Sequence, residues 1–159
     1  MTEQVEHRVH ELLTKKGLTL AVGESCTGGL LGHRITNVAG SSAYFLGGVI
    51  AYAYDAKERL LNVDHLTLYE HGAVSEETAL EMARGSRKAL RADFGVSITG
   101  ISGPAGGLPE KPVGLTWVAV STRSGEWTSE NVWDGDRYEN KEASVDAALE
   151  LLIAVLEKE

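Results

Sequence analysis

Residues Ala21–Leu31 read AVGESCTGGLL and decide the fold of this chain, because an apolar segment passes here into a helix through a turn of hydroxyl residues and glycines. A serine in such a turn, Ser25, can act as a nucleophile. The first N–H groups of the following helix have no partner within it and lie at the positive end of its dipole, so they can hold an oxyanion or a phosphate. In the alternative interpretation, the hydroxyl of Ser25 or Thr27 only caps the helix.

The composition indicates one folded domain. The chain has 159 residues, of which 43% are hydrophobic and 24% charged. A net charge of -8 argues against a nucleic-acid partner, because a protein binds the phosphates of a nucleic acid with a basic face. Any bound anion must therefore be held by a few placed groups. The single cysteine, Cys26, excludes an intrachain disulfide and argues against a structural zinc site, so we expect no metal.

The N-terminal segment is polar and acidic, unlike a secretory signal. No apolar run approaches the roughly 18 residues that a membrane span requires. We therefore expect a cytoplasmic protein in a reducing compartment, with no membrane partner.

Apolar periodicity and turn residues predict the elements. We expect helices over residues 3–16 (with Thr2 as the cap), 27–37, 55–61, 64–71, 76–91 (capped by Ser75) and 138–157, and strands over residues 18–22, 44–54, 94–98, 113–121 and 127–133. Helices alternate with strands early in the chain, and a hairpin and a closing helix follow. This order predicts an α/β fold: a three-layer α/β/α single domain over residues 1–159, with a mixed, mostly parallel sheet and a C-terminal hairpin.

A nucleophilic serine requires a base, and none of the five histidines lies in a turn that suggests a Ser-His-Asp arrangement. A lysine whose pKa is lowered by burial is the alternative activator. Lys57 is the preferred candidate, because it follows the long strand of residues 44–54 directly and so begins a helix at a sheet edge. A solvated lysine on a short helix is the commoner outcome for this residue type.

Two further segments suggest ligand contacts. Residues 97–107, SITGISGPAGG, again combine a strand end, hydroxyl residues and a glycine-rich loop, whose glycines permit backbone amides to approach a ligand. A plain long loop fits the same residues. In Gly135-Asp136-Arg137, Asp136 can cap the last helix and Arg137 can hold a phosphate, although surface arginines are common.

Several short motifs follow one another along the chain: ESCTGG (24–29), GSSAYF (40–45), Tyr52 with DAK (55–57), HGAVSE (71–76), TGISGP (99–104), EKPVG (110–114) and GDR (135–137). In this order they resemble the CinA C-terminal domain family over nearly the whole chain. The family includes stand-alone nicotinamide-nucleotide amidases. Larger members carry an extra N-terminal pyrophosphatase domain, and we expect a stand-alone member here.

The resemblance implies hydrolysis of nicotinamide mononucleotide to nicotinic acid mononucleotide and ammonia, without a cofactor. It implies Ser25 as the nucleophile, Lys57 as the base and Tyr52 as a hydrogen-bonding aid to the lysine. Residues expected to bind the pyridine nucleotide are Cys26, Thr27, Gly28, Gly29, Thr99, Gly100, Gly103 and Arg137, where the turn supplies oxyanion donors and Arg137 binds the ribose phosphate. The resemblance also implies a homodimer.

Three departures from the usual family pattern leave room for a different function. Ala53-Tyr54-Asp55 precedes the lysine, Ala105 follows Gly-Pro, and Tyr138–Lys141 follows Gly-Asp-Arg where relatives often place another arginine. These departures are compatible with a nucleotide-binding module without catalysis. Two further hypotheses stay open. Cys26 can be the nucleophile, since a thiolate at a helix N-terminus has a lowered pKa, and the chain can be an interaction protein in competence or damage pathways.

Overall fold

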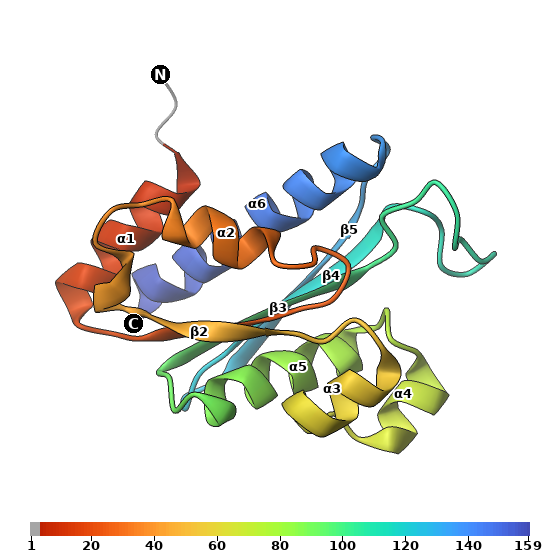
Figure 1. The fold of residues 1–159 in the computed structure, drawn as a ribbon, viewed down its shortest axis with the longest axis horizontal. Coiled ribbons are helices and arrows are strands. Elements are labelled where there is room, and N and C mark those ends of the chain that lie inside the picture. Colours follow the sequence, from red (N-terminus) through yellow and green to blue (C-terminus); the bar gives the residue numbers. More distant parts are fainter. Residues whose placement is uncertain (1–3) are drawn as a thin grey trace.

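A mixed five-stranded sheet in the order β2-β1-β3-β4-β5 forms the middle layer of the computed structural model, which describes residues 4–159 (Figure 1). The strands are β1 (Leu20–Glu24), β2 (Phe45–Ile50), β3 (Phe94–Gly100), β4 (Leu115–Ser121) and β5 (Glu126–Val132). β1 pairs in parallel with both β2 and β3, whereas β4 is antiparallel to β3 and to β5. Four strands thus run in one direction, and β4 and β5 form the expected C-terminal hairpin.

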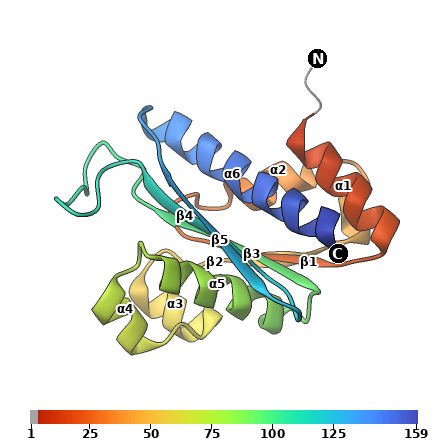
Figure 2. The ribbon, with the colours of Figure 1, turned by 180° about the vertical axis from the view of Figure 1, so that it is seen from behind.

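Helices cover both faces of this sheet (Figures 1 and 2). On one face lie α1 (Val5–Lys16), α2 (Leu30–Thr36) and α6 (Arg137–Lys158), and on the other lie α3 (Tyr54–Leu61), α4 (His65–His71) and α5 (Glu76–Ala89). A short 3-10 helix, Ser41–Ala43, precedes β2. The structure confirms the predicted three-layer α/β fold.

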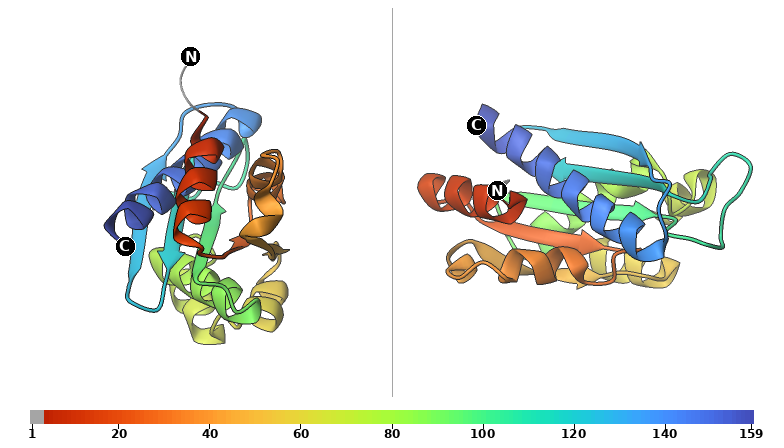
Figure 3. Two further views of the ribbon diagram at one scale, coloured as in Figure 1. Left: turned by 90° about the vertical axis from the view of Figure 1, so that its left-hand side faces the viewer. Right: turned by 90° about the horizontal axis from the view of Figure 1, so that it is seen from above.

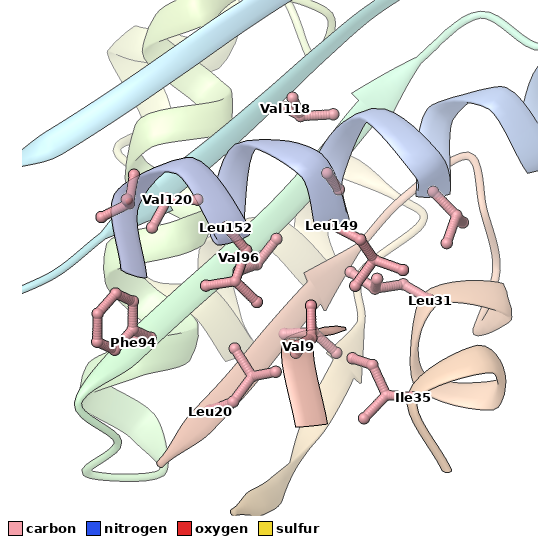
Figure 4. Packing of buried hydrophobic residues seen from close by; sticks show 14 of the residues in the cluster. Val9, Leu20, Leu31, Ile35, Phe94, Val96, Val118, Val120, Leu149 and Leu152 are labelled. Carbon is pink, nitrogen blue, oxygen red and sulfur yellow. The ribbon is translucent and has the colours of Figure 1, made fainter. Parts of the chain in front are cut away.

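The main core lies between the sheet and the layer of α1, α2 and α6. Figure 4 shows Val9, Leu31, Ile35, Leu149 and Leu152 from the helices meeting Leu20, Phe94, Val96, Val118 and Val120 from the strands. Every one of these side chains is at most 2% exposed. Burial of this apolar surface fixes which face of each strand points toward α6, and therefore which residues point toward α5.

Three helix ends follow the expected capping chemistry. The Ser75 hydroxyl accepts the Thr78 N–H at the start of α5, and Asp136 forms a reciprocal capping box with Glu139 at the start of α6. Gly17, with a φ of 64°, ends α1 in the left-handed conformation.

Two predicted boundaries are wrong by three or more residues. The second helix begins at Leu30 rather than residue 27, because Gly28 and Gly29 take left-handed φ angles of 59° and 110° that keep the turn non-helical. The strand expected over residues 44–54 ends at Ile50, and α3 already begins at Tyr54. Thr2 and Glu3, the expected cap and start of the first helix, lie outside the described residues.

Candidate active site

The ends of β1 and β3 place Ser25 and Thr99 beside each other. Glu24 pairs with Ile98 in the parallel ladder, and the Ser25 N–H continues it by donating to the Ile98 carbonyl at 3.0 Å. Side chains alternate along a strand, so Ser25 points to the same face as Gly23, where a Cβ would contact Leu61 of α3. The carboxyl edge of a parallel sheet is where such folds bind ligands.

Lys57 reaches Ser25 from the first turns of α3. Its side chain is 1% exposed, and its Nζ lies 2.8 Å from Ser25 Oγ, 2.8 Å from the Ala51 carbonyl oxygen and 3.0 Å from the Tyr52 carbonyl oxygen. A neutral amine can donate its two N–H groups to the two carbonyls, which leaves its lone pair directed at the Ser25 hydroxyl. In this geometry the amine can accept the proton of the Ser25 hydroxyl.

Burial lowers the pKa of the Lys57 ammonium from 10.5 to about 8. The nearby Cys26 thiol, in its ionised form, opposes this shift. With a pKa of about 8, roughly one molecule in ten carries a neutral Lys57 at pH 7, and the fraction rises steeply above it. Because the side chain of Lys57 is only 1% exposed, the alternative of a solvated helix lysine is wrong.

Glu24 organises the turn that carries Ser25, a role that no motif in the sequence indicated. This carboxylate is 2% exposed and accepts four hydrogen bonds, from the Thr27 hydroxyl at 2.6 Å and from the N–H groups of Gly29, Leu31 and Gly32 at 3.2, 2.9 and 3.0 Å. The signal for it was a carboxylate at the end of a fully apolar strand, because a buried carboxylate requires donors.

The Glu24 contacts correct two expectations. The N-cap of α2 is Gly29, and neither Ser25 nor Thr27 caps the helix with its side chain. The first N–H groups of α2 donate to Glu24, so they are not available for an oxyanion or a phosphate.

Amides that could stabilise an oxyanion beside Ser25 would have to lie earlier in the turn. The Gly28 N–H donates to the Ser25 carbonyl at 3.1 Å. Within residues 4–159, the N–H groups of Cys26 and Thr27 donate to no backbone carbonyl, and they directly follow Ser25 in sequence. These two amides are the remaining candidates for an oxyanion hole.

Tyr52 contributes its carbonyl oxygen rather than its phenol. The side chain is 62% exposed and forms no hydrogen bond with any other residue in the described part of the chain, whereas the carbonyl accepts from Lys57 Nζ. The expected side-chain assistance from Tyr52 is therefore not what the structure shows. Thr99 is buried beside Ser25, and its hydroxyl donates to the Ala73 carbonyl at 2.7 Å.

Cys26 is a buried thiol that packs in the core rather than a reactive one. Burial raises the pKa of its thiol to about 11, although its hydrogen bond with Ser102 and the charges of Lys57 and Lys141 act in the opposite direction. The expectation of a lowered pKa at a helix N-terminus is wrong because α2 begins four residues later and its N–H groups already donate to Glu24. A thiolate nucleophile has no support here.

The loop after β3 lies against the start of α6. Arg137 Nη1 donates to the Gly103 carbonyl at 2.8 Å, and Asn140 Nδ2 donates to the Ser102 carbonyl at 3.0 Å. Gly103 has a φ of 85°, and a Cβ on Gly100 would lie 2.7 Å from Thr116 Oγ1. Seen from above (Figure 3, right), the first turn of α6 comes to the edge where β1 and β3 end. The structure thus brings all the predicted site segments to one edge of the sheet.

Within residues 4–159, no group of three or more histidine, cysteine, aspartate or glutamate side chains is arranged to hold a metal ion. None of the helices in this range is both long and apolar enough to cross a bilayer.

Comparison with known proteins identifies the family. The model of the CinA C-terminal domain matches residues 2–156. The chain belongs to the CinA C-terminal domain family. A putative competence-damage inducible protein of Thermoanaerobacter pseudethanolicus is 49% identical over 94% of this chain and 36% of its own length. A CinA-like protein of Salinibacter ruber is 50% identical over 88% of this chain and 34% of its own length. The chain therefore spans about a third of the length of these relatives.

Solved structures of CinA proteins share the fold. The competence/damage inducible protein of Agrobacterium tumefaciens is 42% identical, has a TM-score of 0.91 and is matched over 99% of this chain and 98% of its own. A CinA superfamily protein of Klebsiella pneumoniae 700603 is 32% identical, with a TM-score of 0.94 and a coverage of 98% of both chains. These similarities confirm the family resemblance drawn from the motifs.

Proposed function

We propose that this CinA domain is an amidohydrolase that converts nicotinamide mononucleotide to nicotinic acid mononucleotide and ammonia. The observation that carries the reaction class is the 2.8 Å contact between Lys57 Nζ and Ser25 Oγ in a buried setting. The resemblance of the motifs supplies the substrate. The two arguments are independent, because the contact itself says nothing about which acyl compound binds.

The reaction begins with transfer of the Ser25 hydroxyl proton to neutral Lys57. Ser25 Oγ bonds to the carboxamide carbon, and the N–H groups of Cys26 and Thr27 stabilise the oxygen that becomes negative. Lys57 then passes the proton to the amide nitrogen, so that the C–N bond breaks and ammonia leaves. An ester between Ser25 and the nicotinoyl group remains.

Hydrolysis of this ester by water completes the cycle. Neutral Lys57 takes a proton from a water molecule whose oxygen attacks the ester carbon. The bond to Ser25 Oγ breaks, and the proton on Lys57 returns to that oxygen. The carboxylic acid is released, and the balance is one water consumed for one ammonia formed.

Ammonia release by purified protein tests the proposal. We expect Ser25→Ala and Lys57→Met each to lower turnover by at least ~1,000-fold. The matched control is Ser42→Ala, since Ser42 is an exposed serine in the 3-10 helix. Unchanged turnover in either site variant would remove that residue from the mechanism. Binding of the nucleotide in calorimetry without ammonia release by the wild type would support the binding-module alternative instead.

We also propose a homodimer formed through the edge of β2. Among the described residues 4–159, β2 pairs only with β1. It exposes Leu46 and Ile50, at 45% and 55%, whereas the opposite edge strand β5 carries Glu126 and Glu130. An open apolar edge is a surface that a second strand covers, and antiparallel pairing of β2 with its own copy satisfies both edges at once. Light scattering should give a dimer for the wild type and a monomer for Leu46→Lys, and a monomeric wild type would contradict the proposal.

A further inference from the structure

Tyr54 lies where this chain departs from the usual family pattern, and the structure gives its phenol a specific contact. Tyr54 is the first residue of α3, three positions before Lys57, and it is 40% exposed. Its Oη accepts the Ala73 N–H at 3.3 Å, and its ring packs edge-on against Tyr69 of α4, with the ring centroids 5.7 Å apart. The phenol therefore connects the helix that carries Lys57 to the segment between α4 and α5, which lies beside it (Figure 1).

Ala73 connects Tyr54 to Thr99. The Ala73 carbonyl oxygen accepts the Thr99 hydroxyl at 2.7 Å, so the N–H and the carbonyl of one residue are held from two sides. Among residues 4–159, the bond to Tyr54 is the one hydrogen bond that joins α3 to residues 72–75. Removal of the phenol would leave Ala73 held on the α3 side by packing alone.

Thr99 lies beside Ser25 on the same face of the sheet. Ser25 directly follows β1, and the parallel register of β1 and β3, continued by one residue, pairs it with Thr99. Neighbouring strands lie about 4.8 Å apart. Thr99 shares its face of β3 with Ser97, whose hydroxyl donates to the Ala79 carbonyl of α5. The Thr99 hydroxyl, on a side chain that is 1% exposed, therefore borders the position of a group bound at Ser25.

The bond to Ala73 determines what Thr99 can offer such a group. A hydroxyl has one proton and two lone pairs, and the Thr99 proton is directed at the Ala73 carbonyl. The oxygen can therefore accept a hydrogen bond at Ser25 but cannot donate one. A carboxamide has N–H groups to donate, whereas a carboxylate has only acceptor oxygens. To bind a carboxylate, Thr99 would have to turn its proton away and leave the Ala73 carbonyl without this donor.

We propose that Tyr54 is a positioning residue that holds Thr99, through Ala73, as a hydrogen-bond acceptor, and that the site thereby prefers the carboxamide of the substrate over the carboxylate of the product. The inference rests on the proposed function for the identity of these two ligands. In that mechanism the carboxamide carbon lies at Ser25, and its nitrogen is the donor that Thr99 accepts. Weak binding of the carboxylate favours release of the product.

Calorimetry with nicotinamide mononucleotide and nicotinic acid mononucleotide measures this preference as the ratio of their dissociation constants. All the proteins carry Ser25→Ala, so that no substrate is consumed. The added variants are Tyr54→Phe, Thr99→Val and Thr99→Ser. Tyr69→Phe is the matched control, since Tyr69 is 66% exposed and its phenol forms no hydrogen bond with any residue from 4 to 159. Hydrogen exchange of the Ala73 amide, followed by NMR, measures the Tyr54 contact directly.

We expect Thr99→Val to reduce the preference for the amide by about 5- to 10-fold, because one hydrogen bond is lost, and Thr99→Ser to keep most of it. Tyr54→Phe should reduce the preference by about 3- to 5-fold. It should also speed exchange of the Ala73 amide by at least about 10-fold, since that N–H loses its acceptor. Tyr69→Phe should change neither quantity.

A purely structural role of Tyr54 would weaken binding of both nucleotides equally and leave their ratio unchanged, which would overturn the assignment. So would an unchanged exchange rate of the Ala73 amide in Tyr54→Phe, a parent protein that does not prefer the amide, or one that binds neither nucleotide. Failure of the amidase proposal has a different signature. In that case the preference for the amide would still depend on Tyr54 and Thr99, while the protein with Ser25 intact would release no ammonia.

Discussion

The Lys57→Met variant should be inactive at every pH, whereas the difference between its free energy of unfolding and that of the wild type should depend on pH. In the wild type, burial shifts the pKa of Lys57 from 10.5 to about 8, which corresponds to at most about 3 kcal/mol against the charged folded state. Methionine removes this cost but leaves the carbonyls of Ala51 and Tyr52 without their donor, at about 1–3 kcal/mol for a fully buried acceptor. The two effects nearly cancel at neutral pH.

The sign of the pH dependence follows from proton binding. Between about pH 8 and 10.5 the unfolded wild type holds a proton on this lysine that the folded protein does not, so its free energy of unfolding rises with pH. We therefore expect the difference in unfolding free energy, wild type minus Lys57→Met, to grow from near zero at neutral pH to about 3 kcal/mol near pH 10.5. Throughout this range the variant should release no ammonia.

Urea unfolding at several pH values measures this difference, and the exposed Lys88→Met is the matched control, whose difference from the wild type should be flat. Titrations common to both proteins cancel in the comparison. A difference that stays constant with pH would mean that Lys57 keeps an ordinary pKa. It would then be protonated at neutral pH, and the argument for it as a base would fail.

The same contacts lead to four more predictions. In the pH–rate profile, kcat/KM should rise with pH and level off above about pH 8, since Lys57 accepts a proton only when neutral; a flat profile would contradict this. Glu24→Gln should lower the free energy of unfolding by about 2–4 kcal/mol in urea titrations, because an amide places N–H groups against N–H donors, and kcat should fall more than KM rises. Gly85→Ala should lower the free energy of unfolding by about 2–3 kcal/mol and reduce ammonia release, because a Cβ would lie 1.9 Å from the Leu61 carbonyl oxygen and displace α3. If the variant were as stable as the wild type, α3 and α5 would be able to move apart without cost. Cys26→Ala should retain kcat, since a thiol with a pKa of about 11 supplies no thiolate near neutral pH, and a large loss would return Cys26 to the mechanism.

Most of the fold was predictable because it depends on local periodicity. The apolar spacing that predicts a helix over residues 3–16 also defines the face of α1 that is buried, with Val9, Leu12 and Leu13 in the core. The wrong boundary at α2 has a local cause: two left-handed glycines hold the turn open, and sequence alone does not distinguish such glycines from ordinary ones. The order of the strands in the sheet came only from the structure, because it depends on pairing between distant segments.

The candidate site was predictable as a set of segments rather than as a set of contacts. The motifs locate Ser25 and Lys57, but the burial of Lys57 depends on α3 packing tightly on α5 at Gly85, which no local pattern encodes. The role of Glu24 was missed for a related reason. Its four donors lie three to eight residues later in the chain and converge on it only when the turn is folded.

The two carbonyls beside Lys57 explain why a lysine suits this site better than a histidine. A neutral amine donates two N–H groups to Ala51 and Tyr52 and accepts from Ser25, and after proton transfer the ammonium keeps both bonds and donates the third N–H to the same oxygen. An imidazole has only two ring nitrogens, so it would leave one buried carbonyl without a donor. Because the same three contacts satisfy the lysine in both protonation states, the proton can move to Lys57 and back without reorganisation of the site, which is the condition under which a buried base is effective.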